Sequence, residues 1–417
     1  MTNQIQWINA LSSRPSLEAA VTEVVDRVQQ ALSASPDLGI LFISSAFGSE
    51  YSRVVPLILE QISIPVLIGC GGGGIVGVKS LGVVTEIEGG QPALSLSVAS
   101  LPDVEVKPFR ILGEDLPDLD SPPEAWVKLI GVDPQKNPAL ILLSDPFSSR
   151  INDLLEGFDF AYPQGIKVGG LASSGAMGVK TGLFYYCQTE SEANLCDRGT
   201  VGIALSGNIV VETIVAQGCR PIGKPYQISK GERNIILELS DLEQSCSRPP
   251  LEVLRDSLLT LDEEDRALAQ NSLFIGTVRD EFKLDLGPRD FLIRNLLGVD
   301  PKSGAIAIGD RVRPGQRIQF HLRDARTSAE DLELLLSSYL EERSVANYPV
   351  GGLIFSCLGR GKGLYNEPDF DSSTFNRYLN NIPLGGFFCN GEIGPVGGRT
   401  FLHGYTSAFA IFSQKNS

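Results

Sequence analysis

Three segments of this chain share one frame, an apolar run that ends on serine and is followed further along by a loop rich in glycine. The runs are 41–44, 141–144 and 353–356, and the loops are 69–77, 170–178 and 386–394. In every loop the glycines obey the spacing G-x4-G-x2-G. One such match would carry little weight in a chain with 44 glycines, but three in the same context predict an internal repeat.

The sequence around each loop extends this frame to a larger unit. Apolar residues at helical spacing precede the three runs, over 17–32, 122–130 and 332–340. After the loops, alternating sequence predicts antiparallel strands at 82–87 with 93–98, at 183–187 with 201–205, and within 401–412. We therefore expect an α/β or α+β fold of layered mixed β-sheets flanked by helices, built from three copies of a strand-helix-strand, glycine-loop and hairpin unit.

The length of 417 residues exceeds what one ordinary hydrophobic core accommodates, so we expect two domains. Between the second and third copies lies a different stretch, 219–326, with short predicted strands at 235–239 and 318–322 and a helix at 250–259. We place the domain boundary near residue 230.

The charge of the chain excludes several classes of partner. It has 50 acidic and 35 basic residues and a formal charge of -15, which repels phosphate backbones and anionic lipid headgroups. Residues 1–20 lack the cationic start and apolar segment of a signal peptide, and no run of apolar residues is long enough to span a membrane. The seven cysteines have no C-x-x-C spacing, which is typical of reduced thiols. We expect a cytoplasmic protein that binds neither nucleic acid nor membranes.

The glycine loops do not fit the known nucleotide motifs. Gly72, Gly74 and Gly77 match G-x-G-x-x-G, but strand-like sequence follows where a dinucleotide fold needs a helix. Ile75 and Val76 stand where a Walker motif needs lysine and a hydroxyl residue. The chain has two histidines and no cysteine pair with metal-site spacing, so we predict neither a metal nor a cofactor.

The third copy differs from the other two in its polar residues. Glu392 follows the middle glycine of its loop, where the other copies have Ile75 and Ala176. Loops at the carboxyl ends of strands usually bind ligands, and an arginine with a carboxylate can hold a zwitterion. Arg360 would bind a carboxylate and Glu392 an ammonium group. The candidate ligand-binding residues are Arg360, Glu392, Asn390, Ser356, Cys357 and His403.

The alternative interpretation is that these residues have a purely structural role. Arg360 and Glu392 could pair only with each other as a buried ion pair. Cys357 and Cys389 could fill small apolar gaps, because free cysteine is among the most buried residue types.

Two sets of motifs resemble a known family. Residues 356–361 (SCLGRG), 383–387 (PLGGF) and 390–394 (NGEIG) are similar to the carboxyl-terminal FIST domain, and residues 69–77, 144–147 (SDPF), 168–170 (VGG) and 218–223 (GCRPIG) resemble the amino-terminal one. The resemblance implies an amino-terminal FIST domain over 35–229 and a carboxyl-terminal one over 230–412. It also implies a sensory module of signal transduction, proposed in bacterial members to bind small ligands such as amino acids. Similar eukaryotic domains follow an F-box.

Three functions remain open at this stage. The leading hypothesis is a stand-alone sensor of amino acids or similar small polar metabolites. No F-box precedes residue 35 and no output domain follows residue 412, so signalling would need a protein partner or a homo-oligomer. The second hypothesis is a protein-interaction scaffold or adaptor.

The third hypothesis is a thiol enzyme that uses Cys357 or Cys389 with His403 as base and Glu392 to orient it. The family resemblance supplies no catalytic residues, so a protein that is not an enzyme is favoured. We therefore assign no catalytic residue.

Overall fold

The computed structural model describes residues 4–80, 82–147, 150–175, 181–190, 193–242, 246–287, 290–343 and 348–415. The chain divides into two compact units. The larger unit comprises residues 1–216 and 333–417, and the smaller one comprises residues 217–332. The smaller unit includes all of the stretch 219–326, which lacks the repeated frame. The predicted boundary near residue 230 separates two domains defined by sequence, which need not coincide with the compact units. It stays a prediction.

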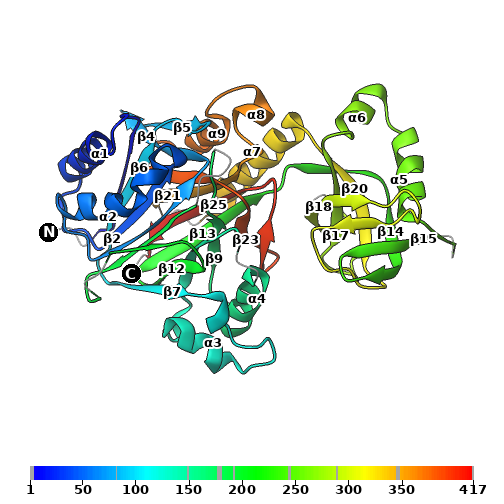
Figure 1. Ribbon diagram of the computed structural model, residues 1–417, viewed down its shortest axis with the longest axis horizontal. Coiled ribbons are helices and arrows are strands. Elements are labelled where there is room, and N and C mark those ends of the chain that lie inside the picture. The colour runs from blue at the N-terminus through cyan, green and yellow to red at the C-terminus, as the bar shows by residue number, and fades with distance from the viewer. Residues whose placement is uncertain are drawn as a thin grey trace. The chain divides into compact units, whose positions relative to one another are not determined.

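The described part of the larger unit contains three six-stranded mixed sheets (Figure 1). The first has the order β1 (Gln6–Ser12), β6 (Leu94–Ser100), β2 (Leu38–Ser44), β3 (Val66–Gly72), β10 (Leu183–Cys187) and β11 (Ala193–Cys196). The second has the order β7 (Val104–Ile111), β12 (Thr200–Gly207), β8 (Ala139–Ser144), β9 (Lys167–Leu171), β23 (Glu392–Val396) and β24 (Arg399–His403). The third has the order β13 (Ile209–Ala216), β25 (Ser407–Gln414), β21 (Pro349–Cys357), β22 (Leu384–Cys389), β4 (Gly74–Ser80) and β5 (Val83–Glu88). These sheets confirm the expected class of layered mixed sheets.

Each sheet is organised around one parallel pair of strands. The pairs are β2 with β3, β8 with β9, and β21 with β22. Two antiparallel strands lie beside the first strand of each pair, and a hairpin lies beside the second. The apolar runs that end on serine are the first strands of these pairs, so the terminal serine and the glycine loop meet at the same end of each sheet.

The predicted hairpin pairings are wrong, although the segments themselves are strands. Strand β5 pairs with β4 and not with β6, and β10 pairs with β11 and β3 and not with β12. Moreover, each hairpin joins the sheet of another copy: β4–β5 pairs with β22, β10–β11 with β3, and β23–β24 with β9. The proposed unit therefore does not fold as one contiguous piece, and its origin as a repeat stays a prediction.

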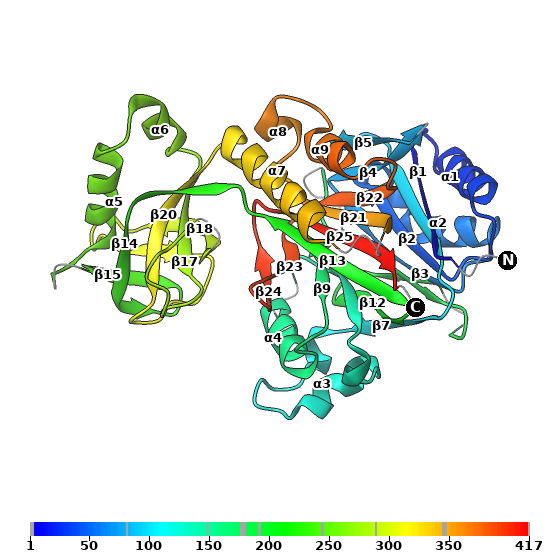
Figure 2. The same cartoon turned by 180° about the vertical axis from the view of Figure 1, so that it is seen from behind.

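One hydrophobic core is enclosed by the three sheets. Phe42 of the first sheet stacks on Phe387 of the third at 5.0 Å between ring centroids, and Ile141 and Val168 of the second sheet belong to the same buried cluster. Helices cover the outer faces, as Figure 2 shows. They are α1 (Leu17–Ala31) and α2 (Tyr51–Leu59) on the first sheet, α3 (Pro123–Ile130) and α4 (Ile151–Ala161) on the second, and α7 (Ala325–Glu342), α8 (Lys362–Tyr365) and α9 (Phe370–Tyr378) near the third.

Local signals fix where these helices begin and end. Helix α1 begins after Ser16, whose hydroxyl oxygen accepts a hydrogen bond from the Ala19 N–H at 3.2 Å. Helix α3 ends at Gly131, which has a φ of 66° and so adopts the left-handed conformation that favours glycine.

The smaller unit is an antiparallel barrel. Its strands are β14 (Cys219–Glu232), β20 (Arg317–Arg323), β17 (Leu273–Val278), β18 (Phe291–Val299), β19 (Ile306–Ile308) and β15 (Ile235–Asp241), and β14 pairs with β15 to close the ring. Strand β16 (Ser247–Arg248) pairs antiparallel with β15. Helices α5 (Pro250–Leu259) and α6 (Glu263–Leu268) contribute apolar side chains to the buried cluster or lie beside it. The two predicted strands and the helix in this stretch are confirmed as β15, β20 and α5.

In the described ranges we find no helix with the length and apolar character that crossing a membrane requires.

Substitution of a glycine in a parallel pair tests how closely the strands approach. A Cβ atom on Gly386 would lie 2.0 Å from the carbonyl oxygen of Ile354 on β21. We expect Gly386→Ala to lower the free energy of unfolding by about 3 kcal/mol, because overpacking forces the strands apart. Denaturant unfolding measures this change. Gly363→Ala in α8 is the control, since its Cβ would meet no described atom within 4 Å, and a similar loss there would contradict the explanation.

Candidate functional site

The predicted site residues lie on two sheets of the larger unit. Ser356 and Cys357 end β21, and Arg360 follows in the next turn. Asn390 precedes β23, where Glu392 pairs across the ladder with His403 of β24. Of the six, Asn390 is exposed, Cys357 is half-buried and the other four are buried.

Arg360 pairs with Asp371, not with Glu392. Its Nε lies 2.7 Å from Asp371 Oδ2 and its Nη2 lies 2.9 Å from Asp371 Oδ1. The exposed fraction of both side chains is 1% or less. The ion pair between Arg360 and Glu392 that we considered is therefore wrong, because the carboxylate that pairs with Arg360 comes from the first turn of α9. Two parallel hydrogen bonds between guanidinium and carboxylate are the strong form of this contact.

Two hydroxyl groups complete the environment of this ion pair. Ser356 Oγ donates to Asp371 Oδ2 at 3.1 Å, and Tyr365 OH donates to Asp371 Oδ1 at 3.2 Å and accepts from Arg360 Nη2 at 2.5 Å. Burial raises the pKa of the Asp371 carboxyl, but Arg360 and the hydroxyl donors lower it by more, so its pKa stays below the usual range. Asp371 is therefore ionised and forms a buried ion pair with the charged Arg360.

Glu392 and His403 each bond to a backbone group. Glu392 Oε2 accepts from the Thr406 N–H at 3.0 Å, and His403 Nε2 lies 3.0 Å from the Gly394 carbonyl oxygen, which places a proton on that nitrogen. The Asn390 N–H donates to the Leu171 carbonyl at 3.1 Å. These contacts fix the β23–β24 hairpin. A role of the six residues in binding a ligand stays a prediction.

The three glycine loops meet beside these residues. The Gly73 N–H donates to Ser173 Oγ at 2.8 Å, and Ser173 Oγ donates to the Phe388 carbonyl. The Gly175 N–H donates to Ser45 Oγ at 3.2 Å. The glycines of these loops thus permit close backbone packing. Ala176 and Gly178 of the second loop lie outside the described residues.

Sequence reasoning missed Glu86, which lies beside Asp371. Glu86 is 7% exposed, and its Oε1 accepts from the Ser372 N–H at 2.8 Å. Its own N–H donates to Asp369 Oδ1 at 2.5 Å. Burial and then the negative charge of Asp371 raise the pKa of Glu86 to about 8. No sequence signal could have placed Glu86 here, because β5 reaches α9 only through the exchange of hairpins between sheets.

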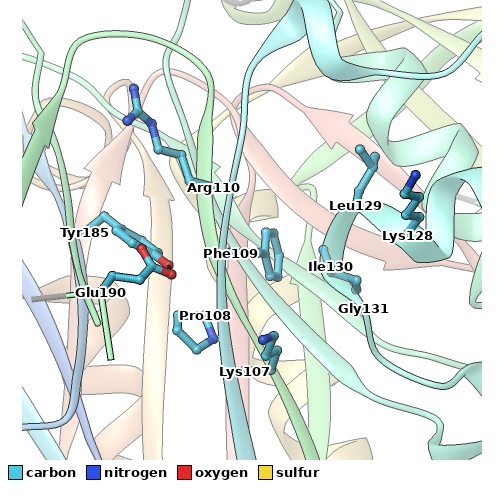
Figure 3. Close-up of a pocket in the computed structure, with 10 residues that line it drawn as sticks. All are labelled: Lys107, Pro108, Phe109, Arg110, Lys128, Leu129, Ile130, Gly131, Tyr185 and Glu190. Carbon is cyan, nitrogen blue, oxygen red and sulfur yellow. Dashed lines mark hydrogen bonds between the residues drawn. The ribbon is translucent and has the colours of Figure 1, made fainter. Parts of the chain in front are cut away.

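An open groove runs along β7, on the free edge of the second sheet (Figure 3). Its volume is about 410 Å³. It is lined by residues 107–110 of β7, residues 128–131 at the end of α3, and Tyr185 and Glu190. Tyr185 OH donates to Glu190 Oε1 at 2.9 Å. In Figure 3, Tyr185 and Glu190 lie on one side of β7, and Lys128 lies on the other.

The groove is basic in an acidic chain. Lys107, Arg110 and Lys128 line it, and none of the three forms an ion pair with any residue that the structure describes. Sequence reasoning also missed this groove, because its residues come from three distant segments.

No group of three or more His, Cys, Asp or Glu side chains within the described ranges has an arrangement that could hold a metal ion.

The structure defines an α/β protein with three mixed β-sheets, and an antiparallel barrel is inserted in its sequence at residues 217–332. The chain belongs to the FIST family, because residues 37–241 match the FIST N domain and residues 250–395 match the FIST C domain. FIST domains are associated with sensing in signal transduction.

Relatives of similar length occur in mycobacteria. An uncharacterized protein of Mycobacterium tuberculosis is 35% identical over 96% of this chain and 98% of its own length, and one of Mycobacterium bovis is 35% identical over 95% and 96%. An F-box/LRR-repeat protein of Arabidopsis thaliana is 26% identical over 50% of this chain and 44% of its own length. Among solved structures, a cyanuric acid hydrolase from A. caulinodans aligns with 99% of this chain and 100% of its own at 8% identity, with a TM-score of 0.37, too low to establish a shared fold.

Removal of the Arg360 side chain should destabilise the folded protein and not only weaken the binding of a ligand. Arg360→Ala leaves the Asp371 carboxylate buried without its partner, so we expect a loss of about 3–5 kcal/mol in the free energy of unfolding. Arg377→Ala in α9 breaks the exposed pair with Glu333 and should cost at most about 1 kcal/mol. Denaturant unfolding of both variants measures the difference. Equal effects would contradict a buried ion pair at Arg360.

Glu86 should make stability fall as pH rises. The folded protein keeps the Glu86 proton up to about pH 8, whereas the unfolded chain loses it near pH 4.5. Between these values the unfolded state binds fewer protons, so this group lowers stability by about 1.4 kcal/mol for each pH unit of increase. Glu86→Gln, which mimics the protonated acid, should remove that contribution. Denaturant unfolding at pH 5.5, 6.5 and 7.5 tests this, and curves that stay parallel for variant and wild type would refute it.

Proposed function

We propose that this chain is a sensory protein of signal transduction that binds a small polar ligand, an amino acid or a metabolite of similar size. The observation that carries the proposal is the groove along β7. Its volume of about 410 Å³ falls within the range of small-molecule sites, and its lining includes charged groups of both signs.

The charged groups suit a zwitterion. Lys107, Arg110 and Lys128 offer unpaired cations for a carboxylate. Glu190, which accepts a hydrogen bond from Tyr185 OH, offers an acceptor for an ammonium group. The overall charge of -15 disfavours anions elsewhere on the surface, so the cations that line the groove add selectivity.

The groove is a better candidate than the residues around Arg360. The Arg360 guanidinium is fully buried and paired with Asp371, so a ligand would have to displace an internal carboxylate. A ligand that binds the cations of the groove would not have to displace an internal carboxylate. Binding by Arg360 and Glu392 would need a rearrangement of the α8–α9 segment, whereas binding at β7 would need none.

The sensor would work in the cytoplasm and pass its signal through a protein partner or a second copy of the chain. All seven cysteines are free thiols, which supports a reducing compartment.

A protein-interaction scaffold is the second candidate. A groove of about 430 Å³ between α4 and the β23–β24 hairpin is lined by Phe160, 55% exposed, and Leu119, 45% exposed. Exposed apolar side chains around a groove favour protein contacts.

The thiol-enzyme hypothesis receives less support. Cys389 is fully buried, and burial raises the pKa of its thiol well above the usual value, which is the opposite of an activated nucleophile.

Thermal unfolding against a panel of amino acids and small carboxylates tests the sensor. A ligand at one hundred times its dissociation constant adds about 2.7 kcal/mol of stability, a shift of several degrees for a protein of this size. We expect Lys107→Gln with Arg110→Gln to abolish the shift and to leave the melting temperature without ligand unchanged. Lys79→Gln, an exposed lysine of β4 outside the groove, is the control. A shift that survives the double variant would exclude the β7 groove, and a flat panel would favour the scaffold.

A further inference from the structure

Two cysteines end the parallel strands of the third sheet side by side. Cys357 is the last residue of β21 and Cys389 the last of β22, and the two are partners in the strand register. Two residues earlier, Phe355 and Phe387 contact each other at 6.0 Å between centroids. Because side chains alternate along a strand, Cys357 and Cys389 point to this same face. Neighbouring strands lie about 4.8 Å apart, within the Cα separation that a disulfide accepts.

Cys357 has the surroundings of a reactive thiol. Cys357 is half-buried, in contrast to Cys389, and its Sγ accepts a hydrogen bond from the Gly359 N–H at 3.5 Å. Burial lowers the pKa of Arg360, but Asp371, Tyr365 and Cys357 raise it by more, so the guanidinium stays charged. A nearby cation and a backbone N–H are typical of cysteines that react.

Cys389 differs from Cys357 in its access to solvent. Its exposed fraction is zero, and burial, followed by the charge of Glu392, raises the pKa of its thiol well above the usual value. A buried, protonated thiol does not attack an oxidant in solution. It can react only with a group that forms next to it.

We propose that Cys357 is a site of oxidation by hydroperoxides and that Cys389 resolves the oxidised form as a disulfide between β21 and β22. The Cys357 thiolate attacks a peroxide oxygen, the O–O bond breaks, and a sulfenic acid and water (or an alcohol) result. The Cys389 sulfur then attacks the sulfenic sulfur, the S–O bond breaks, and the hydroxide leaves as water with the Cys389 proton. Two thiols lose two electrons in total, and the peroxide is reduced. This oxidation is independent of the ligand proposed for the β7 groove.

Peptide mapping of the full chain tests the proposal. After treatment with a few equivalents of hydrogen peroxide, we expect a loss of about 2 Da, a non-reduced peptide that joins Cys357 to Cys389, and reversal by dithiothreitol. Cys389→Ala should leave a sulfenic acid on Cys357 that dimedone traps, and Cys357→Ser should prevent both products. Circular dichroism checks that each variant is folded, and the wild-type map requires no variant.

Cys246 provides the matched control, because its side chain is exposed and it is a free thiol outside the third sheet. Cys246→Ser should leave the linkage unchanged, and Cys357 should react at least about ten times faster than Cys246. Labelling of Cys246 ahead of Cys357 would overturn the proposal. Oxidation of Cys357 with no link to Cys389 in the wild-type protein would overturn it as well.

Discussion

Burial of the central strands of all three sheets on both faces is the constraint on which the larger unit depends. Their inner faces share one core, and helices cover their outer faces, so strands such as β2 and β8 have no exposed residue. Such strands must be apolar throughout, and they approach closely where glycine allows it, as at Gly386 beside Ile354. This packing explains the apolar runs that end on serine and the glycine loops in the sequence.

The exchange of hairpins between sheets ties distant parts of the chain together through polar contacts. Glu86 of β5 accepts from the Ser372 N–H of α9, and Asp159 of α4 accepts from the Thr400 N–H of β24 at 2.6 Å. The Arg360–Asp371 pair stabilises the same α9 region from within. Its desolvation is offset only because both oxygens of the carboxylate and two hydroxyl groups take part. Arg360, which the sequence offers as a candidate binding residue, thus also joins β21 to α9.

Sensing by this protein would use surface residues that take no part in these polar contacts between elements. None of the three cations of the groove at β7 forms an ion pair with a residue that the structure describes. Strand β7 lies at the edge of its sheet, where a ligand can reach it without disturbing the core. Cys357 lies elsewhere, at the carboxyl end of the parallel pair β21 and β22. Its thiol interacts electrostatically with the guanidinium of Arg360. These two places are chemically distinct, so a small metabolite and an oxidant would act on different parts of the larger unit.

The sequence by itself determined the family, the class of fold, the serine-ended strands and most helices, because hydrophobic periodicity and glycine spacing are local properties. It also determined that Arg360 and Glu392 differ from their counterparts in the other copies. Only the tertiary structure decided that Asp371 is the partner of Arg360, that hairpins pair with other sheets, and that Lys107, Lys128 and Tyr185 line one groove. The reason is that strand pairing and burial join segments far apart in the chain, and neither spacing nor composition specifies which strand edges meet.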